Sequence, residues 1–513
     1  MNKIKQALIS VSDKSKLEPL LKCLKKFNIK IISSGNTSKK IKDLGYSSNE
    51  ISNYTKFPEI LSGRVKTLHP KIYGGILSRR NLKSDKSDLK NQNINLIDLV
   101  IVNFYPFEKT LHSTNNHSKI IESIDIGGST LVRAAAKNYE YVTVISNTNQ
   151  YDDLINEINK NNGSTSLDFR RKMSESAFME TGYNDALITE YFNNISKNKY
   201  PLKKLIYGKL IDNLRYGENP HQDGAIYSTG FDQKIKQLSG KKLSYNNYND
   251  LFSALLISKS LPKNIGTVVV KHTNPCGVSI NKDKVKSYKL AISSDPISAF
   301  GGIISFNFKI NKKLAIELNK IFLEVIVCNG IETSALKILS KKKNLRIIDA
   351  SNFKLKKGLI FSSILNSILV QSQDNINFSS KYFKIVSKKK PNSKELKSLI
   401  FAFNVCRFAK SNSIVIVKND STIGIGSGQS SRLDSCEIAI KKLNQFQKID
   451  KEDRIVAASD AFFPFVDGIE KLVQAGVKAI IQPSGSIRDK EIIKFANKTG
   501  TILLFSKTRH FKH

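Results

Sequence analysis

The chain has 513 residues, which is too many for one hydrophobic core, so we expect two to four domains. Apolar residues make up 40% of the sequence, and no run approaches the roughly 18 apolar residues of a membrane helix, which argues against a membrane protein. The five cysteines show no CxxC spacing, which argues against a disulfide framework and a zinc cluster. We therefore expect a cytoplasmic protein that requires no metal.

The formal net charge of +38 would ordinarily suggest a nucleic-acid partner. The lysines, however, are spread along the whole chain, with the longest runs at 341–343 and 388–390, and aromatic residues are not interleaved with them as base stacking would require. We therefore expect no nucleic-acid partner. Two explanations of the charge stay open: a coding bias towards Lys, Asn and Ile, or a field that attracts polyanionic ligands.

Strand patterns alternate with helix patterns in the first part of the chain. Short apolar runs at Gln6–Val11 and Lys30–Ile32 are each followed by a helix pattern, the second of which covers Thr37–Leu44. Further strand patterns follow at Leu99–Asn103 and Tyr141–Ser146. This order predicts a parallel sheet with helices on its faces.

A polar helical region at residues 147–198 leads to an expected hinge at Ser196–Pro201 and a new strand at Leu202–Tyr207. Beyond the hinge, strand patterns come in two rounds and alternate with helix patterns such as Leu251–Ser260. The first round has strands at Thr267–Val270, Ile303–Phe306 and Val325–Val327, and the second at Ile414–Lys418, Thr422–Ile425, Ile455–Ser459, Ala479–Gln482 and Ile502–Phe505. The two rounds predict duplicated α/β units.

Two motifs point to a functional site, and the composition of the first does not suit a protein core. LRYGENPHQ, at residues 214–222, places Arg215 and Tyr216 before a Gly-Glu-Asn-Pro turn. VVVKHTNPCG, at residues 268–277, places Lys271 and His272 at the end of a β-branched run that we expect to break at Asn274-Pro275. Taken singly, each has an ordinary alternative, a capped surface turn or a solvated strand end. Taken together, they indicate a site, because α/β enzymes place their chemistry at strand ends.

With SDAFFPFVDG (residues 459–468), PSGSIRD (483–489) and the terminal RHFKH, these motifs resemble the transformylase half of the AICAR transformylase/IMP cyclohydrolase family. The N-terminal third is similar to the other half in SVSDK, SSGNT, GRVKTLHP, NFYPF, DIGG and RAAAKN. The resemblance covers essentially the whole chain, in order. It implies a methylglyoxal-synthase-like, parallel-sheet α/β domain at residues 1–198, the IMP cyclohydrolase. It also implies a duplicated, cytidine-deaminase-like α/β transformylase region at residues 199–513.

The resemblance further implies the last two steps of IMP synthesis. The co-substrate 10-formyltetrahydrofolate would donate a formyl group to the 5-amino group of AICAR, and the product, FAICAR, would close to IMP with loss of water. The implied partners are small-molecule nucleotides and folate, together with a second copy of the chain in a homodimer.

Ring closure needs a group that orients or deprotonates an amide nitrogen and a cation that stabilises the developing oxyanion. The resemblance assigns these roles to Asp125 and Lys66, and assigns proton delivery to Tyr105 with Lys137. Asp125 could instead be an ordinary N-cap for the helix that follows.

Two loops of this half, SVSDK and SSGNT, each lie between a strand and a helix, where backbone N–H groups attract phosphate. Capping by Ser12, Asp13 and Thr37 is the ordinary alternative for one such loop. The resemblance implies substrate binding by Ser12, Lys14, Ser34, Gly35, Thr37, Arg64, Thr67, Gly127 and Gly128.

Formyl transfer needs proton removal from a weakly nucleophilic amine, for which His272 is the candidate base, with Lys271 as the cation for the formyl oxyanion. Because side chains alternate along a strand, the two act together only if the strand has ended at His272. The resemblance adds Asn412 as a positioning amide and substrate contacts from Arg215, Tyr216, Gly301, Asp467 and Arg509. The aromatic run that contains Phe462, Pro464 and Phe465 suits the flat pterin of folate, with a core strand edge as the alternative.

Three further features bear on this interpretation. IGIGSGQSSR (residues 423–432) has the glycine spacing of a dinucleotide loop, but it follows strands joined by Asn419-Asp420, so we expect a hairpin. Cys328-Asn329 stands where the family is expected to have Ala-Pro, a departure that would loosen a loop near the folate side. Two rival functions are a zinc-dependent deaminase, although its H-x-E and P-C-x-x-C elements are absent, and an RNA-binding protein.

Overall fold

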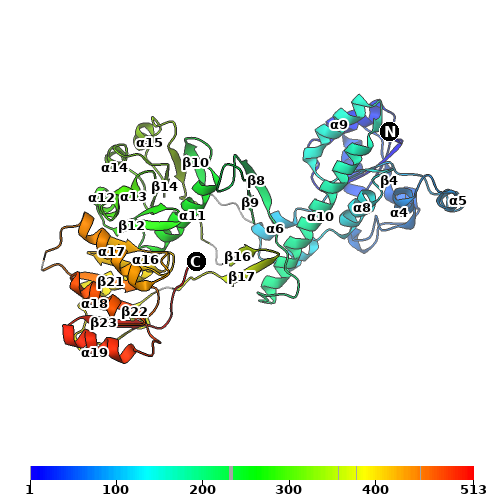
Figure 1. Cartoon of the computed structure of the whole chain (residues 1–513). Coiled ribbons are helices and arrows are strands. Elements are labelled where there is room, and N and C mark those ends of the chain that lie inside the picture. The colour runs from blue at the N-terminus through cyan, green and yellow to red at the C-terminus, as the bar shows by residue number, and fades with distance from the viewer. Residues whose placement is uncertain (1, 230–234, 356–357, 377, 451) are drawn as a thin grey trace. The chain divides into compact units, whose positions relative to one another are not determined.

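The computed structural model describes residues 2–229, 235–355, 358–376, 378–450 and 452–513 (Figure 1). Contacts between Cα atoms divide the chain into two compact units, Met1–Gly208 and Lys209–His513. In the described ranges, no helix combines the length and the apolar character needed to span a membrane.

The first unit is built on a five-stranded sheet of order β4-β3-β2-β5-β6 in which every pair is parallel. Its strands are β2 (Gln6–Val11), β3 (Lys30–Ser33), β4 (Asn49–Glu50), β5 (Leu99–Asn103) and β6 (Thr143–Ile145), with a separate pair β1 (Asn2–Lys3) and β7 (Ser164–Thr165). Its helices are α1 (Leu17–Lys26), α2 (Gly35–Asp43), α3 (Ile51–Thr55), α4 (Pro70–Leu77), α5 (Lys83–Asn91), α6 (Phe107–Ser113), α7 (His117–Glu122), α8 (Ile126–Lys137), α9 (Tyr151–Lys160) and α10 (Leu167–Ile195), with 3-10 turns η1 (Leu61–Gly63) and η2 (Thr148–Gln150). The predicted parallel β-α-β order is confirmed.

Burial explains why these segments fold as they do. The four leucines of α1 that recur at helical spacing, Leu17, Leu20, Leu21 and Leu24, are all buried in the core of this unit. The strand β5 is a continuous apolar run because a parallel sheet is covered on both faces.

The second unit contains a twelve-stranded sheet of order β10-β15-β14-β13-β11-β12-β20-β19-β21-β22-β23-β18. Its first half has β10 (Lys236–Ser239), α11 (Tyr245–Ser260), β11 (Gly266–Lys271), β12 (Asn274–Ile280), α12 (Lys284–Ser293), α13 (Pro296–Ala299), β13 (Ile303–Phe306), α14 (Lys312–Leu318), β14 (Val325–Cys328), α15 (Thr333–Leu339) and β15 (Arg346–Asp349). Its second half has η3 (Ser380–Tyr382), β18 (Phe383–Ile385), α16 (Ser393–Cys406), β19 (Ile414–Lys418), β20 (Ser421–Gly426), α17 (Arg432–Phe446), β21 (Ile455–Ser459), α18 (Asp467–Gln474), β22 (Val477–Pro483), α19 (Asp489–Thr499) and β23 (Ile502–Ser506).

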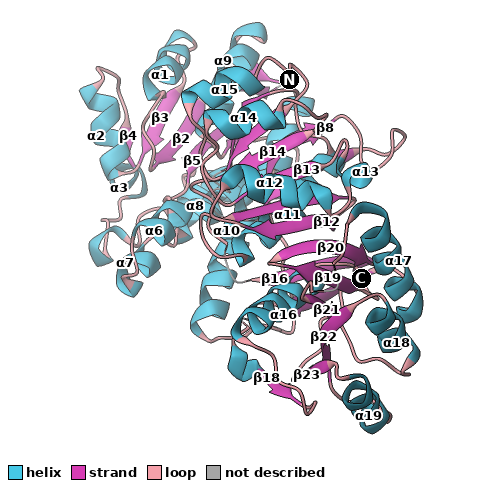
Figure 2. Ribbon diagram, turned by 90° about the vertical axis from the view of Figure 1, so that its left-hand side faces the viewer, coloured by secondary structure: helices cyan, strands magenta, loops and turns pink. Residues whose placement is uncertain are grey.

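The two halves repeat one pairing pattern, which confirms the predicted duplication. In each, an antiparallel hairpin (β11–β12 or β19–β20) pairs antiparallel with the next strand, and two parallel strands and an antiparallel edge strand follow. The halves join through β12 and β20 at Ser279 and Ser421. Figure 2 shows the strands following one another from β14 through β12 and β20 to β23, with helices beside them.

Two local predictions were wrong. Leu202–Tyr207 is not a strand: the segment has no ladder partner, and the first strands of the second unit, β8 (Lys209–Leu214) and β9 (Gly224–Ser228), pair only with each other. Asn274-Pro275 does not break the chain but opens β12, because the turn has already been made at His272–Thr273. Pro275, which has no N–H group, lies opposite Val270 beside a bulge, where a ladder tolerates proline.

Another hairpin, β16 (Leu359–Ile364) with β17 (Ser367–Ser372), also lies outside the long sheet. The expected hairpin at Asn419-Asp420 is confirmed: both residues have left-handed φ angles, of 50° and 58°, and join β19 to β20.

Candidate active sites

In the first unit, the expected nucleotide loops meet where the strand order reverses, between β2 and β5. The backbone N–H groups of Ser12 and Asp13 donate to Asn103 Oδ1 at 2.7 and 2.8 Å, and the Asn103 amide donates to the Asp13 carbonyl. Lys14 Nζ lies 3.3 Å from the Ser12 carbonyl. Open α/β sheets bind ligands at such a crevice, beyond the carboxyl ends of the strands.

The SSGNT loop lies on the neighbouring strand and is tied to the first loop by hydroxyl groups. Ser34 Oγ is 2.9 Å from Ser10 Oγ, and Thr37 Oγ1 bonds both backbone groups of Val11. Ser34 stands at the N-cap of α2, yet its side chain caps no backbone N–H group. Simple capping therefore does not account for this loop, and the helix terminus can attract an anion.

Lys66 and Asp125 are brought together. The positive charge of Lys66 acts on the Asp125 carboxyl, and Lys66 Nζ also lies 3.6 Å from Glu59 Oε1. Burial raises the pKa of Asp125, against the lowering effects of the Gly128 and Tyr105 backbone N–H groups and of Lys66. A carboxylate with a raised pKa is a stronger base, which suits it to orienting or deprotonating a weakly acidic amide.

Asp125 is also the N-cap of α8, because its Oδ1 accepts from the Gly128 N–H group at 2.7 Å. The capping alternative is therefore realised together with the Lys66 interaction. The start of α8 is tightly packed: a Cβ on Gly127 would come within 2.6 Å of Thr67 Oγ1, and one on Gly128 within 2.4 Å of Asp125 Oδ2. Only glycine leaves Thr67 and Asp125 room beside this helix.

Three other residues expected in this site, Tyr105, Arg64 and Lys137, have surroundings that differ from those of Lys66 and Asp125. Tyr105 is 41% exposed and reaches the cluster through its backbone, and Arg64 makes an exposed ion pair with Glu122. Lys137 closes the far end of α8, about 18 Å from Asp125 at 1.5 Å per residue. The structure of one chain does not bring Lys137 to the Lys66–Asp125 cluster.

In the second unit, the expected residues meet at one edge of the long sheet. Pairing directions place the carboxyl ends of β11, β21 and β23 beside the amino ends of β13 and β19. We call this the His272 edge; it holds Lys271, His272, Gly301, Asn412, Phe462, Pro464, Phe465 and Arg509. Cys328, at the end of β14, lies at the opposite edge and is buried, so its departure from the family pattern is not beside His272.

Helix α11 connects the two motifs first noticed in the sequence. Asn246 Nδ2 donates to the Glu218 carbonyl at 3.1 Å, inside RYGENP. One turn later, the Asp250 carboxylate accepts from the N–H groups of His272 and Thr273 at 3.2 and 2.6 Å. Residues four apart share a face of a helix, so one face of α11 holds both motifs.

Lys271 and His272 differ in their surroundings. Lys271 Nζ donates to the Phe300 carbonyl at 3.0 Å, which places it beside Gly301, whose φ of 71° suits glycine. His272 is exposed, and its imidazole has no hydrogen-bond partner among the described residues. The strand ends at Lys271, so the condition for the two side chains to act together is met.

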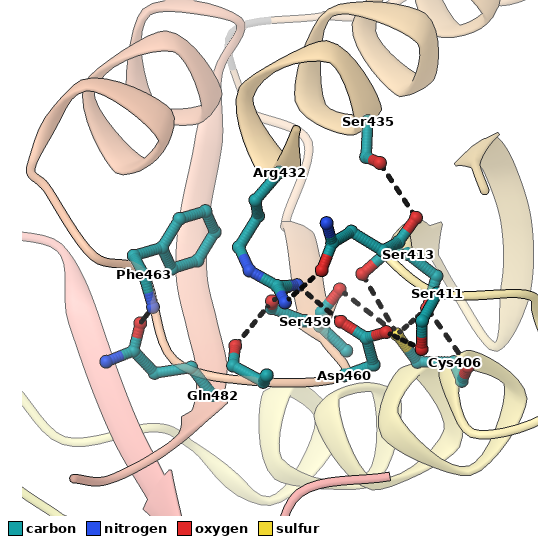
Figure 3. A network of polar contacts seen from close by, with 12 residues as sticks. Cys406, Ser411, Ser413, Arg432, Ser435, Ser459, Asp460, Phe463 and Gln482 are labelled. Atoms are coloured by element: carbon teal, nitrogen blue, oxygen red, sulfur yellow. Dashed lines mark hydrogen bonds and ion pairs between the residues drawn. The ribbon is translucent and has the colours of Figure 1, made fainter. Parts of the chain in front are cut away.

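Asn412 is held by the buried ion pair of Arg432 and Asp460. Figure 3 shows Arg432 and Asp460 within a network of polar contacts. Its Oδ1 accepts from Arg432 Nη2 at 2.7 Å, and its Nδ2 donates to the Gln429 and Ser430 carbonyls. Arg432 in turn pairs with Asp460, whose side chain is fully buried. The Asn412 side chain is therefore fixed in orientation before any substrate binds.

The residues expected to hold folate lie in the loop after Asp460. Phe462 is half-buried, Phe465 is 49% exposed with the Arg488 guanidinium 4.7 Å from its ring centroid, and Phe463 between them belongs to the core. Asp467 begins α18. The loop thus offers exposed aromatic surface, and it begins at Asp460, whose N–H group donates to the carbonyl of Ser413, the residue after Asn412.

Arg215 and Arg509 each stack on an aromatic neighbour. Arg215 lies 4.9 Å from the ring centroid of Tyr216 and donates to its hydroxyl group, and Arg509 lies 4.6 Å from that of Phe511. Both guanidinium groups are exposed and can accept an anionic ligand.

No group of three or more His, Cys, Asp or Glu side chains in the described ranges is arranged to hold a metal ion. Cys276, which could begin a deaminase-like motif, is a buried free thiol whose pKa burial raises to about 12.

Comparison with known proteins identifies the family. Residues 135–442 match the AICARFT/IMPCHase bienzyme family, and residues 16–130 match the MGS-like domain. The chain belongs to the AICARFT/IMPCHase bienzyme family. The bifunctional purine biosynthesis proteins PurH of Persephonella marina and Rhodospirillum rubrum are 44% and 41% identical to it; each alignment covers 99% of this chain, and 100% and 99% of those proteins. The crystal structure of ForH matches 37% of this chain and 97% of its own, with 31% identity and a TM-score of 0.34.

As a member of the AICARFT/IMPCHase bienzyme family, the chain is an enzyme of purine biosynthesis, with AICAR formyltransferase and IMP cyclohydrolase activities that form the last two steps to IMP. The fold class predicted from the sequence, an MGS-like parallel-sheet domain followed by a duplicated α/β region, agrees with this membership.

Sequence reasoning missed several supporting residues of both sites. They are Glu59, Asn103, Asn246, Asp250, Arg432 and Asp460. Glu59 lies only seven residues before Lys66, but the other five act on residues at least 20 positions away in the sequence, which no local spacing reveals. Asn103 alone gave a signal, as a polar residue that closes a buried strand.

Proposed function

We propose that the first unit closes the ring of FAICAR and that the second unit transfers the formyl group. We place the functional division at the predicted hinge, between residues 1–198 and 199–513, which is ten residues before the boundary of the compact units at Gly208. The observation that carries this division is that the Lys66–Asp125 pair lies within the first compact unit and the His272 edge within the second. Each unit also has its own hydrophobic core.

For ring closure, Asp125 orients and deprotonates the carboxamide nitrogen as it attacks the formyl carbon. The Lys66 ammonium group stabilises the oxygen that becomes negative. This oxygen takes up the proton that Asp125 removed and a second proton from Tyr105, and it leaves as water. Tyr105 regains its proton from the former formamide nitrogen, which loses its hydrogen as the ring C=N bond forms. Ser12, Lys14, Ser34, Gly35, Thr37 and Arg64 bind the nucleotide phosphate, and Thr67, Gly127 and Gly128 border the ring. Lys137 takes no step beside Asp125 of the same chain, because the length of α8 separates them.

For formyl transfer, His272 removes the proton from the amine of AICAR as the amine attacks the formyl carbon, and Lys271 stabilises the oxyanion that forms. The bond between the formyl carbon and N10 then breaks, and His272 returns the proton to N10 of the leaving tetrahydrofolate. Asn412 positions the reacting groups. Arg215, Tyr216, Gly301, Asp467 and Arg509 bind the ribotide. The support is the convergence of Lys271, His272 and Asn412 at one sheet edge.

The formyl donor is 10-formyltetrahydrofolate, whose pterin lies against Phe462, Pro464 and Phe465. A flat aromatic ring suits the exposed aromatic surface of that loop. Neither proposed step requires a metal ion, because Lys271 and Lys66 supply the positive charge that each oxyanion needs.

The enzyme acts as a cytoplasmic homodimer, with small molecules rather than nucleic acid or membrane as its ligands. The support for a dimer is the β16–β17 hairpin, where Leu365 is 97% exposed, Leu369 58% and Ile368 54%. Exposed apolar side chains grouped in this way are typical of protein interfaces. Leu365→Glu is expected to give monomers in light scattering; an unchanged dimer would place the interface elsewhere.

His272→Ala tests the assignment of formyl transfer. A general base contributes about 10²–10⁴ in rate, so tetrahydrofolate release should fall by at least two decades. Closure of supplied FAICAR should stay normal, because its residues lie in the other unit. His221→Ala is the matched control in the binding turn, where loss should weaken AICAR binding more than turnover. Near-normal transfer by His272→Ala would remove His272 from the chemistry.

A further inference from the structure

The turn that presents His272 has an unfavourable backbone conformation. His272 and Thr273 have φ angles of 51° and 62°, in the left-handed region that favours glycine, asparagine and aspartate. Thr273 is β-branched, which makes the conformation worse. Such a backbone persists only where its surroundings hold it in place.

Two charged side chains hold this turn. The Asp250 carboxylate accepts from both of its N–H groups, with Oδ2 at 3.2 Å from His272 N and Oδ1 at 2.6 Å from Thr273 N. Lys512 Nζ donates to the Thr273 carbonyl at 3.2 Å and to the Phe408 carbonyl at 2.9 Å. The anion binds the donors of the turn and the cation binds its acceptor, so together they fix the peptide groups on either side of Thr273.

The duplicated half of the sheet provides an internal comparison. Its turn, Asn419–Asp420, has nearly the same left-handed φ angles but is made of residues that tolerate them. Helix α16 places Ser398 where α11 places Asp250, the same number of residues before its hairpin begins. Ser398 donates only to the Asp420 side chain, at 2.9 Å. The carboxylate clamp is therefore a feature of the half whose turn carries His272.

We propose that Asp250 and Lys512 are positioning residues for formyl transfer, which hold the His272–Thr273 turn so that the imidazole faces bound AICAR. The inference rests on the proposed role of His272 as the base. Asp250 and Asn246 lie one turn apart on α11, so the same helix face fixes His272 relative to the RYGENP turn that binds the ribotide.

The test uses Asp250→Asn in the full chain, because the amide keeps the size of the side chain but replaces one acceptor oxygen with a donor group. We expect kcat for formyl transfer to fall at least tenfold while KM for AICAR changes less than threefold. The dependence of kcat on pH should shift or flatten, which a purely structural defect would not cause. Closure of supplied FAICAR should be unchanged.

Two further variants complete the experiment. Ser398→Ala, the matched position in the other half, should leave both activities and the pH profile as in the wild type. Lys512→Met keeps the length of the side chain but loses both hydrogen bonds, and it should lower kcat for transfer several-fold with the same pH signature. If Asp250→Asn proves unfolded, Lys512→Met decides the question.

The outcomes separate this inference from the proposed function. If His272→Ala abolishes transfer while folded Asp250→Asn and Lys512→Met keep a normal kcat and pH profile, the positioning role is wrong and the base assignment survives. If His272→Ala transfers normally, the base assignment fails, and the positioning role fails with it.

Discussion

The buried pair Arg432–Asp460 should be among the most sensitive points of the second unit. The Arg432 guanidinium donates to Asp460, to Ser459 Oγ at 2.8 Å and to Asn412 Oδ1 at 2.7 Å. In Arg432→Met, the fully buried Asp460 carboxylate would keep only the Ser411 hydroxyl as a side-chain donor, at 2.6 Å. Breaking a buried ion pair from one side costs about 3–5 kcal/mol.

We therefore expect Arg432→Met to lower the free energy of unfolding of the second unit by about 3–4 kcal/mol, the lower part of that range, because Ser411 still donates. In urea this is a midpoint shift of about 1 M, because m for a unit of this size is about 3 kcal/mol/M or more. Unfolding should be followed by circular dichroism, with FAICAR closure as a separate reporter of the first unit. Formyl transfer should also fall, because Asn412 loses the donor that orients it.

The double variant Arg432→Met/Asp460→Asn provides the decisive comparison. With no charge left in the core, it should recover about 1 kcal/mol or more relative to Arg432→Met. Arg64→Ala, which removes an exposed ion pair with Glu122, is the control and should change stability by about 1 kcal/mol or less. If Arg432→Met costs no more than Arg64→Ala, or the double variant is no better than the single one, the reasoning about burial is refuted.

Three further outcomes follow from the structure. Lys66→Ala should slow ring closure by two to three decades, as loss of about 2.7–4 kcal/mol of oxyanion stabilisation predicts, with tetrahydrofolate release unchanged; equal losses in both assays would indicate misfolding instead. Because burial raises the pKa of Asp125, the closure rate should decline as pH falls through that raised pKa, and a decline that sets in only at the pKa of an ordinary aspartate would contradict this. All five cysteines are buried with raised pKa values, so an aromatic disulfide reagent at pH 8 should label none of them quickly in the native enzyme and all of them in urea.

The positions of the strands could be predicted from the sequence because burial leaves a local signal. The ranges Ile303–Phe306, Ile414–Lys418 and Ile455–Ser459 coincide with observed strands, since each is an apolar run buried on both faces. Leu202–Tyr207 is only partly apolar and has no strand beside it, and a strand requires a partner. The prediction failed because a strand forms only where the tertiary structure provides a neighbouring strand, which composition does not reveal.

The residues of the candidate sites also divide into those that the sequence could predict and those that it could not. Lys271 and His272 could be found because they follow a β-branched run directly. Asp250 could not, because it is an ordinary helix residue whose function depends on a turn that lies 22 residues away in the sequence. Arg432, 28 residues from Asp460, is a similar case: a helix of mixed composition gave no sign that its first residue would be buried with a carboxylate.

The duplication in the long sheet determines which substitutions its two hairpin turns can tolerate. The two hairpins place their turns at opposite edges, one with His-Thr and the other with Asn-Asp. A residue that replaces Asn419 or Asp420 needs only to adopt the left-handed backbone conformation. A residue that replaces His272 must adopt that conformation and also act as the base. A library that randomises both turns should therefore yield many active enzymes with new residues at 419–420 and almost none with a new residue at 272. Comparing the two positions would show how strongly the backbone conformation and the catalytic role each restrict the choice of residue.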